Sequence, residues 1–382
     1  MKSISIFTFI DAFGWEILQQ HHFMDDFLTT KAPLGTVLGY SSTCIPTILT
    51  GKMPYEHRHL SFFKYDPENS PFSLCRCLSI LPDSITRRGR VRRMMSKVIQ
   101  KFYGYTGYFQ IYNLPFDYLP LFDYSEKRDL YQTGGINDGS PTIFDKLRER
   151  NIPFYLSDWR AKEADNLLAL ERAIDNGGVT FAYVYLAAMD AILHAHGTEA
   201  PIVEEKIQWY DRNLRRIVKL AEQKYSQVNL YIFSDHGMTN TTDECNLMAR
   251  IDKLGLKFGE DYAAMYDSTM ARFWFLNDTA RTKIIQALQE EPRGRILREN
   301  DLNEYGCNFA NHEYGDLFFL TNPGVLINPS FMGEARLAGM HGYDALDKDS
   351  IAMLASNVSP ARMPQRLDGL FQLMKMSVPD LD

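Results

Sequence analysis

Short, continuously apolar runs that alternate with helical patterns constrain the fold of this chain more than any other feature. The strand-like runs lie at residues 3–10, 152–157, 179–187, 228–233 and 350–356, and the helical patterns lie at 141–150, 202–224 and about 361–375. Strands that are apolar along their whole length are typical of parallel sheets with both faces covered. The sequence therefore predicts an α/β fold, a three-layer sandwich with a mostly parallel central sheet.

Two stretches interrupt the alternation. Residues 60–135 are rich in Tyr, Phe and Pro, and residues 240–335 have a mixed, irregular pattern. Neither stretch is bounded by a Gly/Ser-rich linker, and the sequence has no internal repeat. We therefore expect a single domain over residues 1–382, with cap insertions at about 60–135 and 240–335.

The composition indicates which binding partners and which cellular compartment we expect for this protein. The chain has 382 residues and a formal net charge of −7, which disfavours bulk nucleic-acid binding. Its five cysteines include the close pair Cys75 and Cys77 but no second pair to complete a zinc site, so we expect reduced thiols. The first apolar run is interrupted by Asp11 and lacks a cleavage site, and no apolar run is long enough to span a membrane. These features predict a cytoplasmic protein.

Acids and histidines follow the predicted strands in a regular way. Asp11 follows the run 3–10, and Asp190 follows the run 179–187, with His194 four residues later; the others are Asp235 and His236 after the run 228–233, and His341 before the run 350–356. In open parallel sheets, ligands bind beyond the carboxyl ends of the strands. Carboxylate and imidazole together are a ligand set that zinc accepts. Residues four apart on a helix share one face, so Asp190 and His194 suit a single ion.

Each of these elements has an ordinary structural explanation when taken alone. An Asp after a strand is a common helix N-cap, an Asp and a His four residues apart suit a solvated helix face, and Asp235-His236 suits a turn. Their occurrence at successive strand ends favours one site over these separate explanations. The remaining histidines lack such support: His196 is turned away from His194, His57 and His59 suit a surface loop, and His21, His22 and His312 have no partners in the pattern.

Taken together, the motifs resemble a known family. Asp11 after the first strand, the Ser/Thr loop ending in Thr50-Gly51-x-x-Pro54, the Asp190/His194 pair, Ser234-Asp-His-Gly-Met238 and His341-Gly-Tyr-Asp344 resemble the type I phosphodiesterase/nucleotide pyrophosphatase family of the alkaline phosphatase superfamily. The resemblance runs from residue 4 to about 375, with the cap regions outside it. It implies an alkaline phosphatase-like catalytic domain with a two-zinc site. Asp190, His194 and His341 would hold one ion, and Asp11, Asp235 and His236 the other, together with a hydroxyl nucleophile.

The position of the nucleophile rests on counting. The family places a Ser or Thr ten residues before the Gly of Thr-Gly, and this count from Gly51 gives Ser41, with Ser42 and Thr43 as neighbouring candidates. An ordinary helix-capping serine is the alternative for Ser41, since residues 41–50 read as a loop opening into a short helix that stops at Gly51. Cys44-Ile-Pro-Thr47 faintly resembles the sulfatase pattern, but Ile48 replaces its Arg and the histidines argue against a calcium site.

The resemblance implies a metal-dependent hydrolase that cleaves a phosphodiester or pyrophosphate bond through a covalent phosphoseryl or phosphothreonyl intermediate. Two divalent ions, Zn²⁺ or alternatively Mn²⁺, would bind at the site, and Ser41 would be both nucleophile and metal ligand. The expected substrate is a small phosphorylated molecule: a nucleotide, a nucleotide sugar or a lipid-linked phosphodiester. The alternatives are a phospho-group transferase or phosphomonoesterase on the same site, and a catalytically silent phosphate-binding protein.

The first insertion carries an inverted local charge. Residues 86–101 contain seven basic and no acidic side chains, so the rest of the chain sums to −7 − 7 = −14. On a helix, Val91, Met94, Met95, Val98 and Phe102 form one apolar stripe beside the basic residues. Three interpretations compete: a cap helix packed on the sheet, a membrane-surface helix over residues 87–102, and a basic rim for a phosphorylated substrate.

Overall fold

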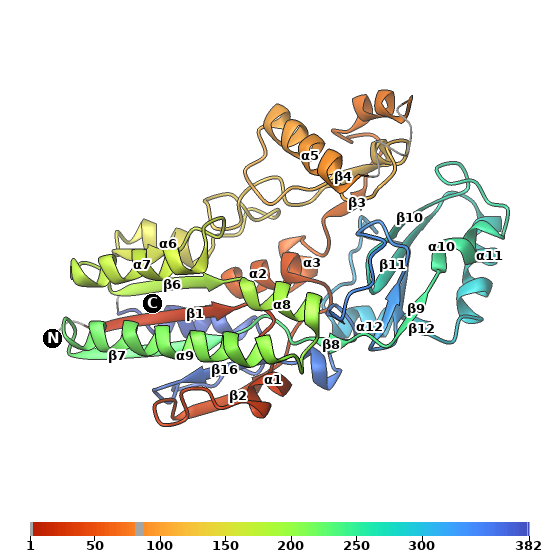
Figure 1. The fold of residues 1–382 in the computed structure, drawn as a ribbon. Coiled ribbons are helices and arrows are strands. Elements are labelled where there is room, and N and C mark those ends of the chain that lie inside the picture. The colour runs from red at the N-terminus through yellow and green to blue at the C-terminus, as the bar shows by residue number, and fades with distance from the viewer. Residues whose placement is uncertain (1–2, 81–87, 380, 382) are drawn as a thin grey trace.

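The computed structural model describes residues 3–80, 88–379 and 381 of the chain. Its centre is a sheet of six strands in the order β2-β16-β7-β1-β6-β5 (Figure 1). The strands are β1 (Ser3–Ile10), β2 (Thr30–Leu34), β5 (Phe154–Leu156), β6 (Phe181–Leu186), β7 (Gln227–Phe233) and β16 (Ala352–Ser356). β1 pairs parallel with β6 and β7, whereas β16 pairs antiparallel with β7 and β2. The predicted mostly parallel sheet is confirmed, with β16 as the strand that runs the other way.

Alternate residues of β1 face two apolar layers. Ile4 and Ile6 pack in the layer of α1 (Trp15–Gln20), α7 (Glu163–Asp175), α8 (Ala188–His196) and α9 (Pro201–Glu222). Phe7 and Phe9 pack in the layer of α2 (Ser41–Thr50), α6 (Ile143–Glu149) and α13 (Gly369–Met376). Helices therefore cover both faces of the sheet, and the three-layer α/β fold class predicted from the sequence is confirmed.

Several predicted elements differ in detail from the structure. The last helix begins at Gly369 and not near residue 361, and the edge strand β2 was not predicted, because its sequence Thr-Lys-Ala-Pro-Leu lacks an apolar run. α2 begins at Ser41 itself and ends at Gly51, whose φ of 70° is the left-handed conformation that a glycine adopts without strain.

The two insertions build one body, which we call the cap (Figure 1). A single apolar core joins residues from 63–124 to residues from 245–331. Its main sheet has the order β10-β11-β13-β12. The cap elements and the short segments beside them are α3 (Pro54–His57), β3 (Phe63–Tyr65), η1 (Ser73–Ile80), α5 (Gly89–Tyr103), η2 (Leu119–Leu121), β4 (Phe122–Tyr124), β8 (Thr239–Asn240), β9 (Asp243–Cys245), α10 (Leu247–Asp252), β10 (Tyr262–Tyr266), β11 (Met270–Phe275), α11 (Asp278–Gln289), β12 (Gly294–Ile296), α12 (Glu299–Glu304), β13 (Leu317–Thr321), β14 (Val325–Ile327), β15 (Gly339–Met340) and η3 (Lys348–Ser350).

Arg272 on β11 links the two insertions. Its fully buried guanidinium pairs with Asp267 at 3.1 Å and donates to the Phe63 carbonyl at 3.0 Å and to Ser61 Oγ at 2.9 Å. Ser61 and Phe63 belong to the first insertion, and Arg272 and Asp267 belong to the second. A buried cation with these partners holds the two insertions in a fixed position relative to each other.

In helix α5, three residues of the predicted apolar stripe are exposed, so the interpretation that the stripe packs on the central sheet is wrong. Met94, Val98 and Phe102 are 61%, 63% and 71% exposed, while Arg92, Ser96 and Ile99 are the buried residues. Arg92 is buried because its guanidinium donates to the Leu114 carbonyl at 2.7 Å and lies over the Phe116 ring. The helix therefore packs on its own loop in the cap and not on the central sheet. Arg87 of the basic stretch lies outside the described residues. None of the helices in residues 3–80 and 88–379 is both long and apolar enough for a bilayer crossing.

Candidate metal and active site

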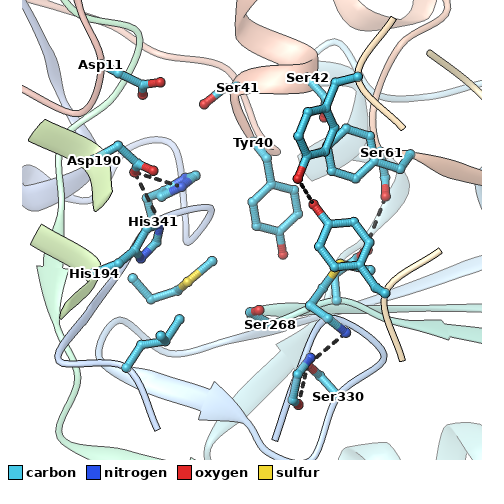
Figure 2. A pocket seen from close by; sticks show the side chains of 18 of the residues that line it. Asp11, Tyr40, Ser41, Ser42, Ser61, Asp190, His194, Ser268, Ser330 and His341 are labelled. Carbon is cyan, nitrogen blue, oxygen red and sulfur yellow. Dashed lines mark hydrogen bonds and ion pairs between the residues drawn. The ribbon is translucent and has the colours of Figure 1, made fainter. Parts of the chain in front are cut away.

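The carboxyl edge of the sheet brings together all seven side chains singled out in the sequence. Asp11 directly follows β1, Asp190 and His194 lie on α8 after β6, and Asp235 and His236 follow β7. His341 follows β15, and Ser41 is the first residue of α2. Figure 2 shows Asp11, Asp190, His194 and His341 gathered at one end of a pocket, with Ser41 beside them.

Asp190, His194 and His341 form the first cluster. Asp190 Oδ1 lies 3.2 Å from His194 Nε2 and 3.5 Å from His341 Nε2. One ligand atom from each residue lies within 4.8 Å of the others, as a single metal ion requires. Helix α8 therefore presents the Asp190 carboxylate and the His194 imidazole on one face, as their spacing predicts.

Asp11, Asp235 and His236 form the second cluster, which is buried. His236 Nε2 lies 3.2 Å from Asp235 Oδ2 and 3.6 Å from Asp11 Oδ1. The second oxygen of Asp11 accepts a hydrogen bond from the Tyr185 hydroxyl. The His236 ring stacks on His341 with 3.7 Å between ring centroids, so the two clusters are in direct contact.

Backbone carbonyls fix the orientation of two histidines. His194 Nδ1 lies 2.9 Å from the Gly339 carbonyl, and His236 Nδ1 lies 2.9 Å from the Gly237 carbonyl. A carbonyl only accepts, so each Nδ1 must carry the proton and each Nε2 must present its lone pair to its cluster. This arrangement of a carbonyl behind an imidazole is typical of metal ligands.

The electrostatics of the clusters call for a cation. Burial, and then the charges of Asp235 and Asp190, raise the pKa of Asp11 well above its usual range, and burial raises the pKa of Asp235 to about 7. Burial also disfavours the charged form of Asp190, but the neighbouring His194 imidazole outweighs it and lowers the pKa of Asp190. Asp11 Oδ1, Asp190 Oδ1 and Asp235 Oδ2 are buried and accept no hydrogen bond from the described residues. Because buried carboxylates need a positive partner, the residues fit two divalent ions.

The three candidate nucleophiles differ in where their hydroxyls point. Ser41 Oγ lies 3.2 Å from His236 Nε2, at the second cluster. Ser42 Oγ is buried with no hydrogen-bond partner among the described residues, and Thr43 Oγ1 donates to the Leu60 carbonyl. The geometry thus favours Ser41 over its two neighbours.

The other histidines lie outside both clusters. His196 ends α8 and is exposed. The expectation that His57 and His59 lie in a surface loop is wrong, because both are buried: His57 Nε2 bonds to Thr47 Oγ1 at 2.9 Å, and His59 Nε2 accepts from the Asn137 backbone at 3.0 Å.

A cavity of about 550 Å³ opens from the clusters toward the cap. Glu126 and several aromatic side chains line it, and sequence reasoning did not single them out. The aromatic richness of residues 103–124 was the available signal, but no spacing rule places those rings at the site.

A helix-start hydroxyl beside two carboxylate–imidazole clusters, at the carboxyl edge of an α/β sheet, defines a metal-dependent hydrolase. The family model described as type I phosphodiesterase / nucleotide pyrophosphatase matches residues 7–344, so the chain belongs to this family of hydrolases, as the motifs predict. No curated protein matches the chain.

Solved structures show the same fold. Murine ectonucleotide pyrophosphatase/phosphodiesterase 5 is 15% identical with a TM-score of 0.68, and the match covers 98% of this chain and 94% of that one. The human protein is 13% identical with a TM-score of 0.69 and the same coverage. An inactive threonine-to-alanine form of the murine protein in complex with AMP is 14% identical with a TM-score of 0.67, covering 99% of this chain and 95% of that one.

Proposed function

We propose that this protein hydrolyses a phosphodiester or pyrophosphate bond, with Ser41 as nucleophile and two divalent ions at the clusters. The observation that carries the proposal is the position of Ser41 Oγ, 3.2 Å from His236 Nε2 in the buried second cluster. In both clusters, buried carboxylate oxygens accept no hydrogen bond from the described residues. Asp190, His194 and His341 would hold one ion, and Asp11, Asp235, His236 and Ser41 the other. We favour Zn²⁺, with Mn²⁺ as the alternative, because the ligand set mixes imidazole and carboxylate.

The chain positions the nucleophile and the phosphoryl group. The first hydrogen bonds of α2 run from the Thr43 and Cys44 amides to the Tyr40 carbonyl. The amides of Ser41 and Ser42 lie before these bonds and have no acceptor within the helix. Amides at a helix start favour a phosphoryl oxygen. When bound, the metal ions supply charge neutralisation and a lower pKa for a coordinated hydroxyl.

The proposed reaction has two steps. In the first, Ser41 Oγ bonds to phosphorus and the bond to the leaving oxygen breaks. The proton of Ser41 leaves on the departing group, which is an alcohol for a phosphodiester and a phosphate for a pyrophosphate. In the second, water attacks the phosphoseryl group, which releases a phosphomonoester and restores the Ser41 hydroxyl. A second alcohol in place of water would make the protein a transferase.

The substrate is proposed to be a small phosphorylated molecule: a nucleotide, a nucleotide sugar or a lipid-linked phosphodiester. The AMP complex of the murine relative supports a nucleoside monophosphoryl group, and the cavity of about 550 Å³ has room for a group of that size. The cap, as part of the same catalytic domain, would select the substituent on phosphorus.

Metal-dependent turnover tests the proposal. The purified protein is stripped with a chelator, reloaded with zinc or manganese, and assayed with bis-p-nitrophenyl phosphate. We expect about two ions per chain, activity only in the loaded form, and phosphate labelling that maps to Ser41. A loaded, folded protein that binds nucleotide without turnover would instead support the silent binding protein.

We also propose that α5 touches anionic membrane surfaces. Met94, Val98 and Phe102 are exposed on one side of the helix, beside the exposed basic residues Arg90, Arg93, Lys97 and Lys101. None of these four cations pairs with a carboxylate in the described part of the chain. A helix surface of this composition suits the boundary of anionic lipid, where each basic residue contributes about 1 kcal/mol.

A further inference from the structure

A second hollow lies in the cap, outside the cavity at the clusters, and we call it the cap pocket. It has a volume of about 420 Å³, and both insertions contribute to its lining. Ser330 and Glu334 line the cap pocket as well as the cavity, so the two adjoin at the turn 330–334. Ser330 Oγ accepts from the Met332 and Gly333 amides, both at 3.2 Å, which fixes this turn. A hollow of this size suits a small-molecule group.

Aromatic rings form the main wall of the cap pocket. Tyr118 from the first insertion stacks on Phe258 from the second, with 3.8 Å between the ring centroids and 14° between the ring planes. The Phe331 centroid lies 6.3 Å from that of Tyr118 and 6.5 Å from that of Phe258. Tyr118 and Phe258 are only partly buried. The stacked pair therefore offers a flat apolar surface to a ligand.

Three polar side chains line the same pocket and can form further hydrogen bonds. The Asn113 amide group and the Asp252 carboxylate make no hydrogen bond with the described residues. Asn246 caps the start of α10 with its Oδ1, so its NH₂ group is left for a ligand. Burial, and then the charge of Asp252, raise the pKa of Tyr118 and of Tyr262, which places this carboxylate near the rings.

The chemistry of this lining discriminates between classes of ligand. Within the described chain it includes no Lys and no Arg, so a phosphate or carboxylate group would find no cation there. An ammonium group needs only acceptors, whereas Asn113 and Asn246 offer NH₂ donors. Asp252 is exposed, so water compensates its charge. Sugar hydroxyls both donate and accept, and the C–H groups on one side of a sugar ring suit the negative face of an aromatic ring.

We propose that the cap pocket binds a sugar ring of a glycan. One face of the sugar packs on Tyr118 and Phe258, and its hydroxyls bond to Asn113, Asn246 and Asp252. This site goes beyond the proposed function, because it lies outside the two clusters and takes a neutral ligand.

Saturation-transfer NMR on the purified protein tests the site. The probes are the methyl glycosides of glucose, galactose, mannose and N-acetylglucosamine, with choline and inorganic phosphate as charged competitors. We expect transfer to at least one glycoside, strongest at the C–H protons of one ring face, with a dissociation constant of about 1 mM. Neither competitor should displace it. An absence of transfer to all four glycosides, or displacement by choline, would overturn the inference.

An aromatic variant tests the wall of the pocket. Phe258→Ala removes half of the stacked pair and should weaken glycoside binding by about fivefold or more. Phe102→Ala is the matched control, since it removes an exposed ring of the same cap that does not line the pocket. Equal weakening by both variants would refute the site. Should Phe258→Ala fail to fold, Asn113→Ala decides: it should weaken binding by about threefold or more, and unchanged binding counts against the site.

A charge variant separates a sugar site from a cation site. Asp252→Asn keeps two hydrogen-bonding atoms and removes the charge, so glycoside binding should stay within about threefold of the wild type. Complete loss of binding in this variant would show that the charge is required, and it would overturn the inference. The site and the proposed function fail separately: glycoside binding is measured without turnover, and an absence of diester hydrolysis would overturn the proposed function alone.

Discussion

The edge of the central sheet and the wall of the cap contribute to one cavity but are built in different ways. Asp11, Asp190 and Asp235 lie in the segments that follow β1, β6 and β7, so the parallel sheet sets where these acids meet. The cap wall combines Phe62 and Glu126 from one insertion with residues such as Asp267 from the other. Under the proposed function, the reaction would therefore be specified by the core and the choice of substrate by the cap.

The largest expected effect concerns the core edge. Asp235→Ala or His341→Ala removes one ligand from a cluster, and we expect at least about a 10³-fold loss in hydrolysis of bis-p-nitrophenyl phosphate, with loss of bound metal. His196→Ala is the matched control, since this exposed histidine ends the same helix that carries His194. Full activity in either cluster variant would contradict the ligand assignment.

The second prediction separates neighbouring hydroxyls at the start of α2. Ser41→Ala should abolish covalent phosphate labelling and lower kcat by about 10³-fold, because it removes the atom that attacks phosphorus. Ser42→Ala should stay within threefold of the wild type. Thr43→Ala should cost about 1 kcal/mol of stability through its lost bond to the Leu60 carbonyl, with labelling retained. Labelling that survives in Ser41→Ala would move the nucleophile elsewhere.

The third prediction tests whether the cap depends on its own buried pair. Arg272→Met leaves Asp267 buried without its cation and should lower the free energy of unfolding by about 3–5 kcal/mol. The double variant Arg272→Met/Asp267→Leu should recover most of that loss. Chemical denaturation gives the totals, and hydrogen exchange should show the loss in residues 245–331 before the central sheet. Uniform loss of protection would mean that core and cap unfold together.

The smallest expected effect lies on the outer surface of the cap. Reversing two charges of α5, Arg93→Glu with Lys97→Glu, should reduce binding to vesicles with anionic lipid by about tenfold or more. Hydrolysis of a small soluble substrate should not change. The control carries the same charge change on the core helix α9, Arg212→Glu with Lys219→Glu, both exposed. Flotation with and without anionic lipid measures the difference, and an absence of binding by the wild type would remove the membrane proposal.

The sequence predicts the core because periodicity and strand ends determine position there. The runs at 3–10, 179–187 and 228–233 become β1, β6 and β7, and the acids after them meet at one edge. The antiparallel direction of β16 could not be predicted, because a run of apolar residues does not indicate in which direction its strand runs. The packing of the cap could not be predicted either. Arg92 is buried and Met94 is exposed, the reverse of what their hydropathy predicts. Arg92 is buried because its guanidinium bonds to the Leu114 carbonyl and lies over the Phe116 ring. No sequence pattern marked Glu126, since only tertiary packing places it in the wall of the cavity.

The shared apolar core of the cap has a consequence for the newly made chain. Tyr124 and Cys245 pack in one core but stand 121 positions apart in the sequence. At about 5–20 residues per second, a ribosome needs about 6–24 seconds to cover that interval. During that interval, the aromatic side chains of the first insertion lack the residues of the second insertion that bury them. The emerging polypeptide therefore has a period of exposure to aggregation, and to chaperone binding, that ends when residues 245–331 arrive.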